Sequence, residues 1–571
     1  MGSPEAPARG AQTEKSACLR GGAPDRGATL QPLAPSAHLD TFPRDSLPPR
    51  REWPELVFDL PELHYPGRLN CAEELLDATI ARFGAQRPAL RDGSGRVWSY
   101  GLLREHVDRI ARVLTEDLGL VPGNRVLLRG PNSPWLAACW LAVLKAGGVA
   151  VTTMALLRAT ELREIATKAR IGLALCHSGY TDELERAGLP GLRVMEYGDA
   201  GSELNRRADA KPAQFAAVPT AADDVALIAF TSGTSGLPKA TMHFHRDVLA
   251  IADTFSARVL RPRPDDLFGG SPPLAFTFGL GGLLVFPLRA GASALLLEKA
   301  APEELFTAVG RHGVTVLFTA PTAYRTALRR IDTYDLRSLR RCVSAGEALP
   351  ADTWHAFERA TGHRIIEGIG STEMLHVFIS AADDDIRPGC TGRPVPGFRA
   401  RVIDENGAVV PDGVPGRLAV QGPTGCRYLS DDRQRAQVQD GWNITGDIYV
   451  RDADGYFRYQ ARADDMIVTA GYNVAAPEVE QAVLRHPAVL DCGVVGVPDA
   501  ERGSVVKSFV VPAPGVEPSE QLARDIQEFV KSEIAPYKYP RLVEFVAALP
   551  IGATGKLQRH VLRAGAPVDR P

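Results

Sequence analysis

The sequence lacks the features of a membrane-spanning, disulfide-stabilised or nucleic-acid-binding protein. No stretch reaches the roughly 18 consecutive apolar residues of a spanning helix, and even the run 279–288 is interrupted by glycines and ends at Arg289. The eight cysteines are scattered without a C-x-x-C pair, and we recognise no secretory signal, so we expect reduced thiols. With 65 Lys and Arg against 68 Asp and Glu, no block of like charge indicates a phosphate-backbone partner. We therefore expect a soluble, cytoplasmic protein without membrane or nucleic-acid partners.

The length of 571 residues, with 45% apolar and 23% charged residues, is enough for a large enzyme with several subdomains. Residues 1 to about 50 are rich in proline and show no period of 2 or 3.6. We expect this segment to be a disordered tail, since burial of its side chains cannot offset the conformational entropy lost on ordering. Acidic residues such as Glu5 and Asp25, together with the prolines, argue against a transit peptide.

From about residue 55 the chain alternates helical and strand patterns. Apolar residues between Leu103 and Leu118 recur at i+3/i+4 spacing, which predicts an amphipathic helix, and a strand follows at 126–128. A second helix at 135–145 precedes a strand at 149–151, and further apolar runs occur at 225–230. This alternation predicts layered α/β subdomains with buried, largely parallel strands.

After about residue 390 the pattern changes to short strands separated by Asn-Gly, Asp-Gly and Gly-Pro turns, which predicts a β-rich subdomain. Beyond Asp464 a helix at 477–485, a strand at 493–497 and a helix at about 519–534 indicate a small α+β domain. We therefore expect a tail over 1–50, a large N-terminal domain over 51–463 and a C-terminal domain over 464–571.

The segment 231–239 follows an apolar strand and predicts a loop that holds phosphates. Its glycines can turn backbone N–H groups inward, its hydroxyls add donors, and its lysine adds positive charge. It is not a Walker loop, because Leu237 and Pro238 separate the last glycine from the lysine. The candidate nucleotide ligands here are Thr231, Ser232, Gly233, Thr234, Ser235, Gly236 and Lys239.

Four further segments accompany this loop in a fixed order: 370–373 (GSTE), 441–447 (GWNITGD), 462–465 (RADD) and 550–556 (PIGATGK). Together the five segments resemble the motif set of the adenylate-forming enzymes, which include acyl-CoA synthetases, adenylation domains and luciferases. The resemblance covers about residues 70–565. It implies a large AMP-binding domain with a mobile C-terminal domain, and ATP, Mg²⁺ and coenzyme A as cofactors and cosubstrates.

The resemblance also implies roles for individual residues. Glu373 is expected to bind Mg²⁺, and Thr372 to donate a hydrogen bond to the α-phosphate. Asp447 suits the two ribose hydroxyls, since an ionised carboxylate accepts two hydrogen bonds, and Arg462 joins it. The remaining nucleotide contacts are expected from Ala345, Gly346, Glu347, Glu367, Gly368 and Ile369.

Residues of the C-terminal domain are expected to act at different steps, Lys556 during adenylation and Gly471 and Tyr472 during thioester formation. Lys556 matches the catalytic lysine that approaches the carboxylate and phosphate oxygens during adenylation. Asp464 occupies the hinge position, where a large φ/ψ change rotates the domain. That rotation is expected to withdraw Lys556 and bring Gly471 and Tyr472 to a tunnel for the CoA thiol.

The run 367–376 (EGIGSTEMLH) resembles the benzoate and 2-aminobenzoate CoA ligase branch. Phe276 and Phe278 would then line the acyl pocket, since aromatic walls suit a flat ring, and Gly370 would leave a slot. His376 could bond an ortho amino or hydroxyl group, or could be a structural histidine. The pair His243 and His245 is interpreted as local structure and not as a metal site.

The leading interpretation is an ATP-dependent aryl-CoA ligase, an AMP-forming acid–thiol ligase. Its carboxylic acid would be 2-aminobenzoate, benzoate or a salicylate-like or bicyclic acid. Because the segment 535–541 is shared with medium-chain acyl-CoA synthetases, such an activity is one alternative. A second is transfer of the acyl group to a separate carrier protein, and a third, of another class, is a non-catalytic nucleotide-binding regulator. A monomer or a homodimer fits each of these.

Overall fold

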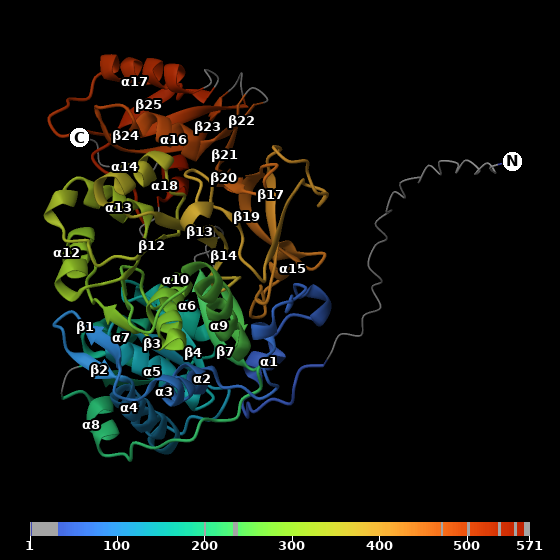
Figure 1. The fold of residues 1–571 in the computed structure, drawn as a ribbon, viewed down its shortest axis with the longest axis vertical. Helices are drawn as coiled ribbons and strands as arrows, with labels where there is room; N and C mark the ends of the chain where they lie inside the picture. Colours follow the sequence, from blue (N-terminus) through green and yellow to red (C-terminus); the bar gives the residue numbers. More distant parts are fainter. Residues whose placement is uncertain are drawn as a thin grey trace. The chain divides into compact units, whose positions relative to one another are not determined.

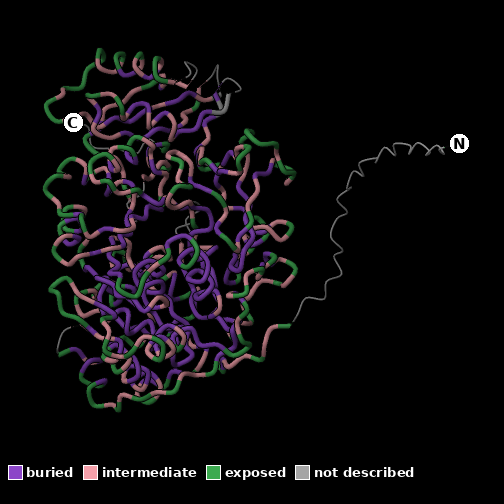
Figure 2. Tube along the Cα trace, in the orientation of Figure 1, coloured by how far each residue is buried: buried purple, intermediate pink, exposed green. Residues whose placement is uncertain are grey.

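The computed structural model describes residue 2 and residues 32–198, 201–231, 238–469, 472–499, 503–534, 538–552 and 557–564. The side chains of residues 464, 468, 472, 473 and 503 are not described. The chain divides into two units, Met1–Leu33 and Ala34–Pro571, and nearly all described residues belong to the second. Figure 1 shows its elements and Figure 2 the burial of its residues.

One sheet of the second unit has the strand order β6-β5-β3-β4-β7-β8 among the described residues. Its strands run parallel except for the last pair, β7 and β8. The first five strands are connected through helices, as the alternating sequence pattern predicts. The bounds are β3 Arg125–Arg129, β4 Val149–Thr153, β5 Leu173–His177, β6 Arg193–Tyr197, β7 Val225–Thr231 and β8 Lys239–Phe244.

A second sheet has the order β15-β14-β13-β12-β11-β9-β10-β1-β2 in the described part of the chain. The strands from β13 through β1 in this order are parallel, and the pairings at both ends are antiparallel. The bounds are β1 Pro88–Asp92, β2 Val97–Ser99, β9 Leu267–Gly270, β10 Ser293–Leu296, β11 Val316–Thr319, β12 Arg341–Ser344, β13 Ile365–Gly370, β14 Val377–Ser380 and β15 Arg393–Pro394.

The helices of these layers begin and end where local chemistry dictates. In α5, Ser133 caps the first turn by accepting from the Leu136 N–H at 3.2 Å, Pro134 fits the first position, and Gly147 with φ +73° follows the end. The bounds are α1 Phe42–Asp45, α2 Cys71–Leu75, α3 Asp77–Phe83, α4 Tyr100–Arg112, α5 Pro134–Lys145, α6 Ala159–Lys168, α7 Asp182–Ala187, α8 Glu203–Asp209, α9 His245–Ile251, α10 Thr277–Leu280, α11 Phe286–Ala290, α12 Pro302–His312, α13 Pro321–Leu328 and α14 Ala351–Thr361.

The β-rich part expected after residue 390 is a separate sheet with the order β16-β17-β19-β18, and β20 pairs with β19. The C-terminal part contains a β21–β22 pair and a β23-β24-β25 sheet with helices. The bounds are β16 Arg399–Ile403, β17 Gly416–Gln421, α15 Gln434–Gln437, β18 Val438–Gln439, β19 Trp442–Arg451, β20 Phe457–Arg462, β21 Met466–Thr469, β22 Tyr472–Ala475, α16 Ala476–Leu484, β23 Val489–Asp499, β24 Gly503–Pro512, α17 Glu520–Glu533, β25 Leu542–Phe545 and α18 Arg559–Arg563. The mixed α/β class and the C-terminal α+β part agree with the prediction from sequence.

The expectation of a disordered tail reaching to residue 50 is wrong for residues 34–50. Asp224 accepts from the Ala37 N–H at 2.9 Å, pairs with Arg44 at 3.2 Å and also bonds the Ser36 hydroxyl. Asp40 pairs with Arg125. We call residues 34–45 the N-terminal strap. The segment lacks a helix or strand period, but a buried acceptor on the core orders it through individual hydrogen bonds.

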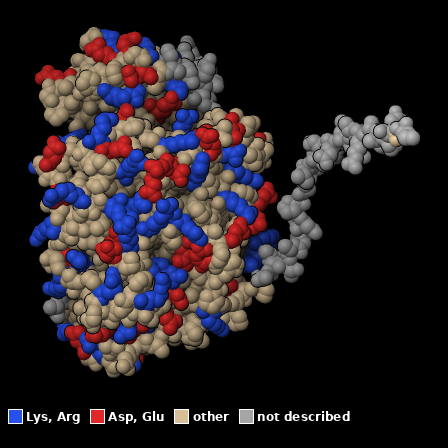
Figure 3. Space-filling view, in the orientation of Figure 1, with Lys and Arg blue, Asp and Glu red and all other residues tan. Residues whose placement is uncertain are grey.

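Charged side chains of both signs are interspersed over the face shown in Figure 3, as the net charge of −3 suggests. Within the described ranges, no helix is both long and apolar enough to cross a bilayer. The cysteines described by the structure are all free thiols, and most are buried.

Candidate active site

Three of the predicted motif segments follow the carboxyl ends of parallel strands. Residue 231 ends β7, residues 345–347 follow β12, and residues 371–375 follow β13. In open α/β sheets this edge is where ligands bind. The topology therefore agrees with a nucleotide site built from these segments.

The predicted phosphate loop connects two antiparallel strands. Thr231 at the end of β7 is the ladder partner of Lys239 at the start of β8, so the two residues flank the base of the connection. Alternation along β8 puts Lys239, Thr241 and His243 on the same face. Ser232, Gly233, Thr234, Ser235 and Gly236 lie outside the described residues, and their phosphate contacts stay a prediction.

The segment that contains Thr372 and Glu373 forms a tight turn between β13 and β14. The Thr372 carbonyl accepts from the Leu375 N–H at 3.1 Å and contacts His243 Nε2 at 2.8 Å. Because a carbonyl only accepts, His243 donates here from Nε2. Leu375 is fully buried with φ +67°, a left-handed conformation that costs free energy in a leucine, so the surrounding contacts must impose it.

Two contacts from the segment before α15 hold the same turn. The Thr424 hydroxyl donates to the Met374 carbonyl at 2.7 Å. The Tyr428 hydroxyl donates to Glu373 Oε1 at 2.6 Å. Burial raises the pKa of Tyr428, with the Glu373 carboxylate as the next cause, so the phenol stays protonated and remains a donor.

The carboxylate of Glu373 is an oxygen ligand of the type that Mg²⁺ prefers alongside phosphates. It is half-buried, and its Oε1 accepts from the Tyr428 hydroxyl. This carboxylate would suit a magnesium ion that offsets the charge of ATP phosphates. Its role as a metal ligand is inferred from the resemblance.

Asp447 and Arg462, predicted to act together, are neighbours in the β-rich sheet. Arg462 Nη1 lies 3.1 Å from Asp447 Oδ1 and also donates to the Thr445 carbonyl at 3.1 Å. Gly446 precedes Asp447 with φ +76°, and a Cβ there would lie 3.0 Å from the Arg462 guanidinium. Glycine therefore both permits the turn and leaves room for Arg462.

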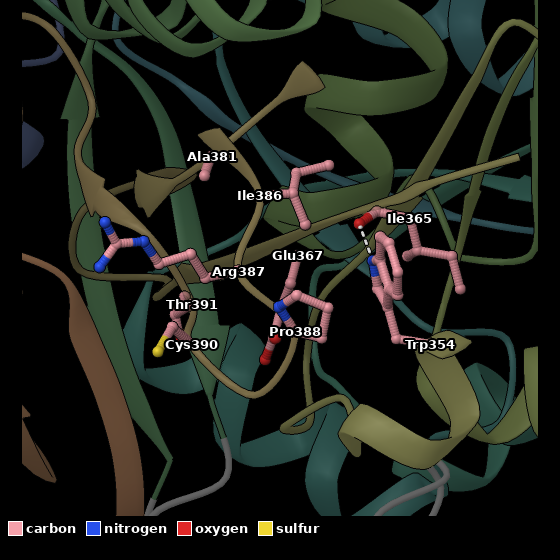
Figure 4. A pocket seen from close by; sticks show the side chains of 9 residues that line it. All are labelled: Trp354, Ile365, Glu367, Ala381, Ile386, Arg387, Pro388, Cys390 and Thr391. Carbon is pink, nitrogen blue, oxygen red and sulfur yellow. Dashed lines mark hydrogen bonds between the residues drawn. The ribbon is translucent and has the colours of Figure 1, made fainter. Parts of the chain in front are cut away.

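The predicted adenine-side residues lie on, or directly after, two neighbouring strands. Ala345, Gly346 and Glu347 follow β12, while Glu367, Gly368 and Ile369 lie on β13, which pairs with β12 in parallel. Glu367 Oε1 accepts from the Leu349 N–H at 3.0 Å and so ties the two segments together. Figure 4 shows Glu367 lining a small pocket. Burial raises the pKa of Glu367 to about 7.

His376 is surrounded by aromatic rings. Its ring centroid lies 4.6 Å from that of Phe286, 5.5 Å from that of Phe255 and 5.7 Å from that of Phe278. Among the described residues, neither ring nitrogen has a hydrogen-bond partner. Burial lowers the pKa of His376 to about 3, although the Phe278 backbone opposes this shift, so the imidazole is neutral near pH 7.

Glycines allow the close packing around His376. A Cβ at Gly281 would lie 2.3 Å from its ring, and one at Gly370 would lie 2.6 Å from its carbonyl oxygen. Phe278 is half-buried and also contacts Phe318 at 5.4 Å between ring centroids, and Phe276 is half-buried as well. The predicted acyl-pocket residues Phe278, Gly370 and His376 are thus brought together, and their contact with substrate stays a prediction.

The predicted C-terminal residues are only partly described. Asp464 lies in the turn 463–465, but its side chain is not described; Gly471 and Lys556 lie outside the described residues, and Tyr472 is described for its backbone alone. The neighbouring Asp465 pairs with Arg559 at 3.2 Å and with Arg563 at 2.5 Å. The hinge, tunnel and catalytic-lysine roles therefore stay predictions.

A cleft of about 710 Å³ lies at the carboxyl ends of β1 and β10, lined among others by Asn132, Lys299 and Arg311. None of the predicted site residues that the structure describes lines it. Its lysine and arginine are offset by the acidic lining residues Asp92, Glu298, Glu303 and Glu304. The cleft therefore gives no clear chemical preference for a ligand.

Sequence patterns do not reveal the roles of Tyr428 and Thr424 or the contact made by His243. Tyr428 and Thr424 follow a strand in a Gly- and Pro-containing loop, which in sequence resembles any turn. His243 is interpreted from sequence as local structure, but its Nε2 donates to the Thr372 carbonyl, 129 residues away in the chain. No spacing rule connects residues 243, 424 and 428 with residues 372–374, so only the fold reveals them.

Comparison with known proteins shows the family of the chain. The AMP-binding enzyme family profile matches residues 76–428, and the profile of the AMP-binding enzyme C-terminal domain matches residues 478–556. The benzoate–CoA ligase of Thauera aromatica is 35% identical over 519 residues, covering 88% of this chain and 97% of that protein. Human acyl-coenzyme A synthetase ACSM3 is 33% identical, covering 88% and 90% respectively.

A solved structure of the anthranilate CoA ligase AuaEII in complex with anthranoyl-AMP superposes with a TM-score of 0.83 at 35% identity. It covers 88% of this chain and 98% of that one. Since the family profile spans more than half of the sequence and relatives above 30% identity are covered almost completely, the chain belongs to the AMP-binding enzyme family.

Proposed function

We propose that this protein is an ATP-dependent aryl-CoA ligase whose acid is a single aromatic ring with an ortho amino or hydroxyl group. The observation that carries the substrate class is His376, buried against three phenylalanine rings, whose ring nitrogens have no hydrogen-bond partner of normal geometry among the described residues. An unsatisfied buried polar group costs about 1–3 kcal/mol, so a ligand that bonds it gains affinity. A neutral imidazole can donate and accept, which suits either substituent.

The reaction has two steps. In the first, a carboxylate oxygen attacks the α-phosphorus of ATP, giving the acyl adenylate and pyrophosphate. In the second, the CoA thiolate attacks the acyl carbonyl carbon and AMP leaves. A magnesium ion bound at Glu373 would offset phosphate charge, and Lys239 adds fixed positive charge beside the phosphate loop.

The names of relatives support this class of acid. The benzoate–CoA ligase and the structure titled anthranilate CoA ligase match over nearly their whole length. ACSM3, named an acyl-coenzyme A synthetase, matches at comparable identity. The phenylalanines around His376 favour the aromatic acid. We place the reaction in the cytoplasm, where ATP and CoA are both present.

A pyrophosphate-release assay over benzoate, 2-aminobenzoate, 4-aminobenzoate and octanoate, with and without CoA, tests the proposal. We expect 2-aminobenzoate to have the highest kcat/KM and thioester to form with free CoA. Preference for octanoate would indicate a medium-chain enzyme. Adenylate formation without transfer to CoA would indicate a carrier-protein acceptor, and no release with any acid would indicate a regulator.

Substitution of His376 tests its role separately. His376→Ala should reduce the discrimination between 2-aminobenzoate and benzoate by about 5- to 100-fold, the range expected for one buried hydrogen bond. Benzoate turnover itself should fall less. His363→Ala is the matched control, since the His363 ring bonds the Leu336 carbonyl at 3.0 Å, away from the predicted acyl pocket. An unchanged ortho preference in His376→Ala would remove His376 from the acyl site.

A further inference from the structure

Tyr428 joins two parts of the nucleotide site that the sequence treats as separate motifs. Its hydroxyl donates to Glu373 Oε1 at 2.6 Å, while Gln437 Oε1 lies farther away at 3.3 Å. A hydroxyl has one hydrogen to donate, and the shorter contact to a carboxylate is the stronger one. Glu373 is therefore the main acceptor.

The ring of Tyr428 also contacts the phosphate-loop lysine. Lys239 Nζ lies 5.4 Å from the ring centroid, within the range of a cation–π contact. Lys239 begins β8, directly after the predicted phosphate loop. One side chain thus touches both the cation of that loop and the carboxylate of the following motif.

The backbone of Tyr428 is fixed against β8. The Leu429 N–H donates to the Ala240 carbonyl at 2.8 Å, and the Met242 N–H donates to the Arg427 carbonyl at 2.8 Å. Tyr428 lies opposite Thr241 in this bridge. The Tyr428 N–H is also bonded, to Gln434 Oε1 at 2.9 Å.

A buried ion pair secures the same segment from the other side. Arg427 and Asp247 are both fully buried and bonded to each other. Neighbouring side chains of an extended segment point to opposite faces, so this pair directs Arg427 into the core and Tyr428 toward Glu373. Removing one partner of such a pair would leave an uncompensated buried charge. The free-energy cost of breaking the Arg427–Asp247 pair therefore keeps the segment in this register.

We propose that Tyr428 is a positioning residue for the adenylation step, which sets the Glu373 carboxylate relative to Lys239. Its hydroxyl engages Oε1, and the Glu373 carboxylate would hold the metal. The proposal rests on membership of the AMP-binding enzyme family and not on the aromatic substrate. It concerns the first half-reaction, in which Glu373 and Lys239 would both act on ATP.

Tyr428→Phe is the direct test, because it keeps the ring and removes only the hydroxyl. Loss of a residue that orients a metal ligand typically weakens metal binding about 10- to 100-fold. We expect Mn²⁺ binding to the enzyme–ATP complex, followed by electron paramagnetic resonance, to weaken by about that factor. The Mg²⁺ concentration for half-maximal pyrophosphate exchange should rise in parallel. Thioester formation from supplied acyl-AMP should change much less.

Tyr324→Phe provides the matched control. Tyr324 is also fully buried, and its hydroxyl donates to the Val343 carbonyl at 3.1 Å. The control loses a comparable hydrogen bond on a different element and should leave Mn²⁺ affinity unchanged. Equal loss of Mn²⁺ affinity in both variants, or none in Tyr428→Phe, would overturn the proposal.

A double-mutant cycle with Glu373→Gln separates positioning from general destabilisation. If Tyr428 acts through Glu373, the double variant should bind Mn²⁺ less than about twofold more weakly than Glu373→Gln alone. The reason is that the effects of substitutions at coupled residues are not additive. Full additivity of the two losses would show that Tyr428 acts elsewhere. The cycle compares folded proteins, with thermal unfolding of each variant measured alongside.

Discussion

Asp447 and Arg462 are directly opposite each other in the β19–β20 ladder, with Arg462 Nη1 3.1 Å from Asp447 Oδ1. The two residues belong to separate sequence motifs, and the sheet makes them one unit. A carboxylate held in place by an arginine keeps acceptor capacity for a ligand diol. This pairing gives the ribose prediction a definite geometry to test.

Asp447→Asn should raise the KM for ATP by about 10- to 100-fold, because hydrogen bonds to a charged group contribute about 1.5–3 kcal/mol. Pyrophosphate exchange at varied ATP measures the effect. Asp412→Asn is the control, since Asp412 pairs with Arg451 of the same β19 strand at 2.6 Å and is partly exposed. A similar KM change in both variants would contradict ribose binding at Asp447.

Lys556→Ala should slow acyl-adenylate formation by about 10²–10³-fold, the scale expected for loss of one preorganised charge. Thioester formation from supplied acyl-AMP should be much less affected, since the resemblance implies that Lys556 acts in one domain orientation. Single-turnover assays of each half-reaction measure both rates. Lys531→Ala, which removes a lysine paired with Glu528 on α17, is the control. Equal losses in both half-reactions would refute the prediction.

Asp464→Pro should have the opposite effect, because proline fixes φ near −65° and a hinge must change φ. Adenylate should still form, while thioester formation slows and adenylate accumulates on the enzyme. Asp464→Ala keeps the backbone freedom and should turn over at close to the wild-type rate. Normal steady-state turnover of Asp464→Pro would show that residue 464 is no hinge.

Much of the fold could be predicted from local patterns. The apolar spacing between Leu103 and Leu118 appears as α4 and the turn that continues it, and the run 225–230 appears as β7. Such elements carry their own signal, since burial on one face imposes a period on the sequence. The N-terminal strap has no period, because its order comes from Asp224, about 190 positions away in the chain.

The residues of the candidate site also divide into those with a local sequence signal and those without one. Residues within motifs, such as Lys239, Glu373 and Asp447, could be predicted because glycines, hydroxyls and charges occur at short spacing. Tyr428 and Thr424 could not, because their partners lie about 50 residues away and hydrogen bonds across the fold leave no local pattern. The aromatic surroundings of His376 likewise come from Phe255 and Phe286, which lie far from it in the chain and belong to none of the predicted motifs.

Glu367→Gln should change how stability depends on pH. Burial raises the pKa of Glu367 to about 7 from an ordinary value of 4.5. Between these values the folded protein binds more protons than the unfolded chain, so this contribution to stability is complete below pH 4.5 and is lost as pH rises through 7. The unfolding free energy of wild type should therefore fall by about 1–3 kcal/mol relative to Glu367→Gln between pH 5 and pH 8.

Urea unfolding of both proteins at several pH values measures this difference. The glutamine can still accept from the Leu349 N–H, so the local hydrogen bond is preserved. Glu303→Gln, which changes an exposed glutamate, should run parallel to wild type at every pH. A constant difference between wild type and Glu367→Gln would refute the prediction.

Removal of residues 1–31 should leave thermal unfolding unchanged, whereas removal of residues 1–45 should lower the Tm. The longer deletion removes the contacts of Asp224 with the Ala37 N–H and Arg44, and hydrogen bonds to a charged group contribute about 1.5–3 kcal/mol. Differential scanning calorimetry of the two shortened chains and the full chain measures the effect. Equal Tm values for all three would show that the strap contributes nothing to stability.

Because Thr231 pairs with Lys239, an insertion within β8 and an insertion in the connection before it have different effects on the sheet. One residue inserted within β8 would turn Lys239 and His243 to opposite faces of the strand, so the lysine and the Thr372 contact could not both be kept. A change in the number of residues between 231 and 239 leaves that register intact. During evolution the connection can therefore vary in length and composition with few consequences for the sheet. In contrast, β8 tolerates substitution but not the insertion or deletion of a single residue.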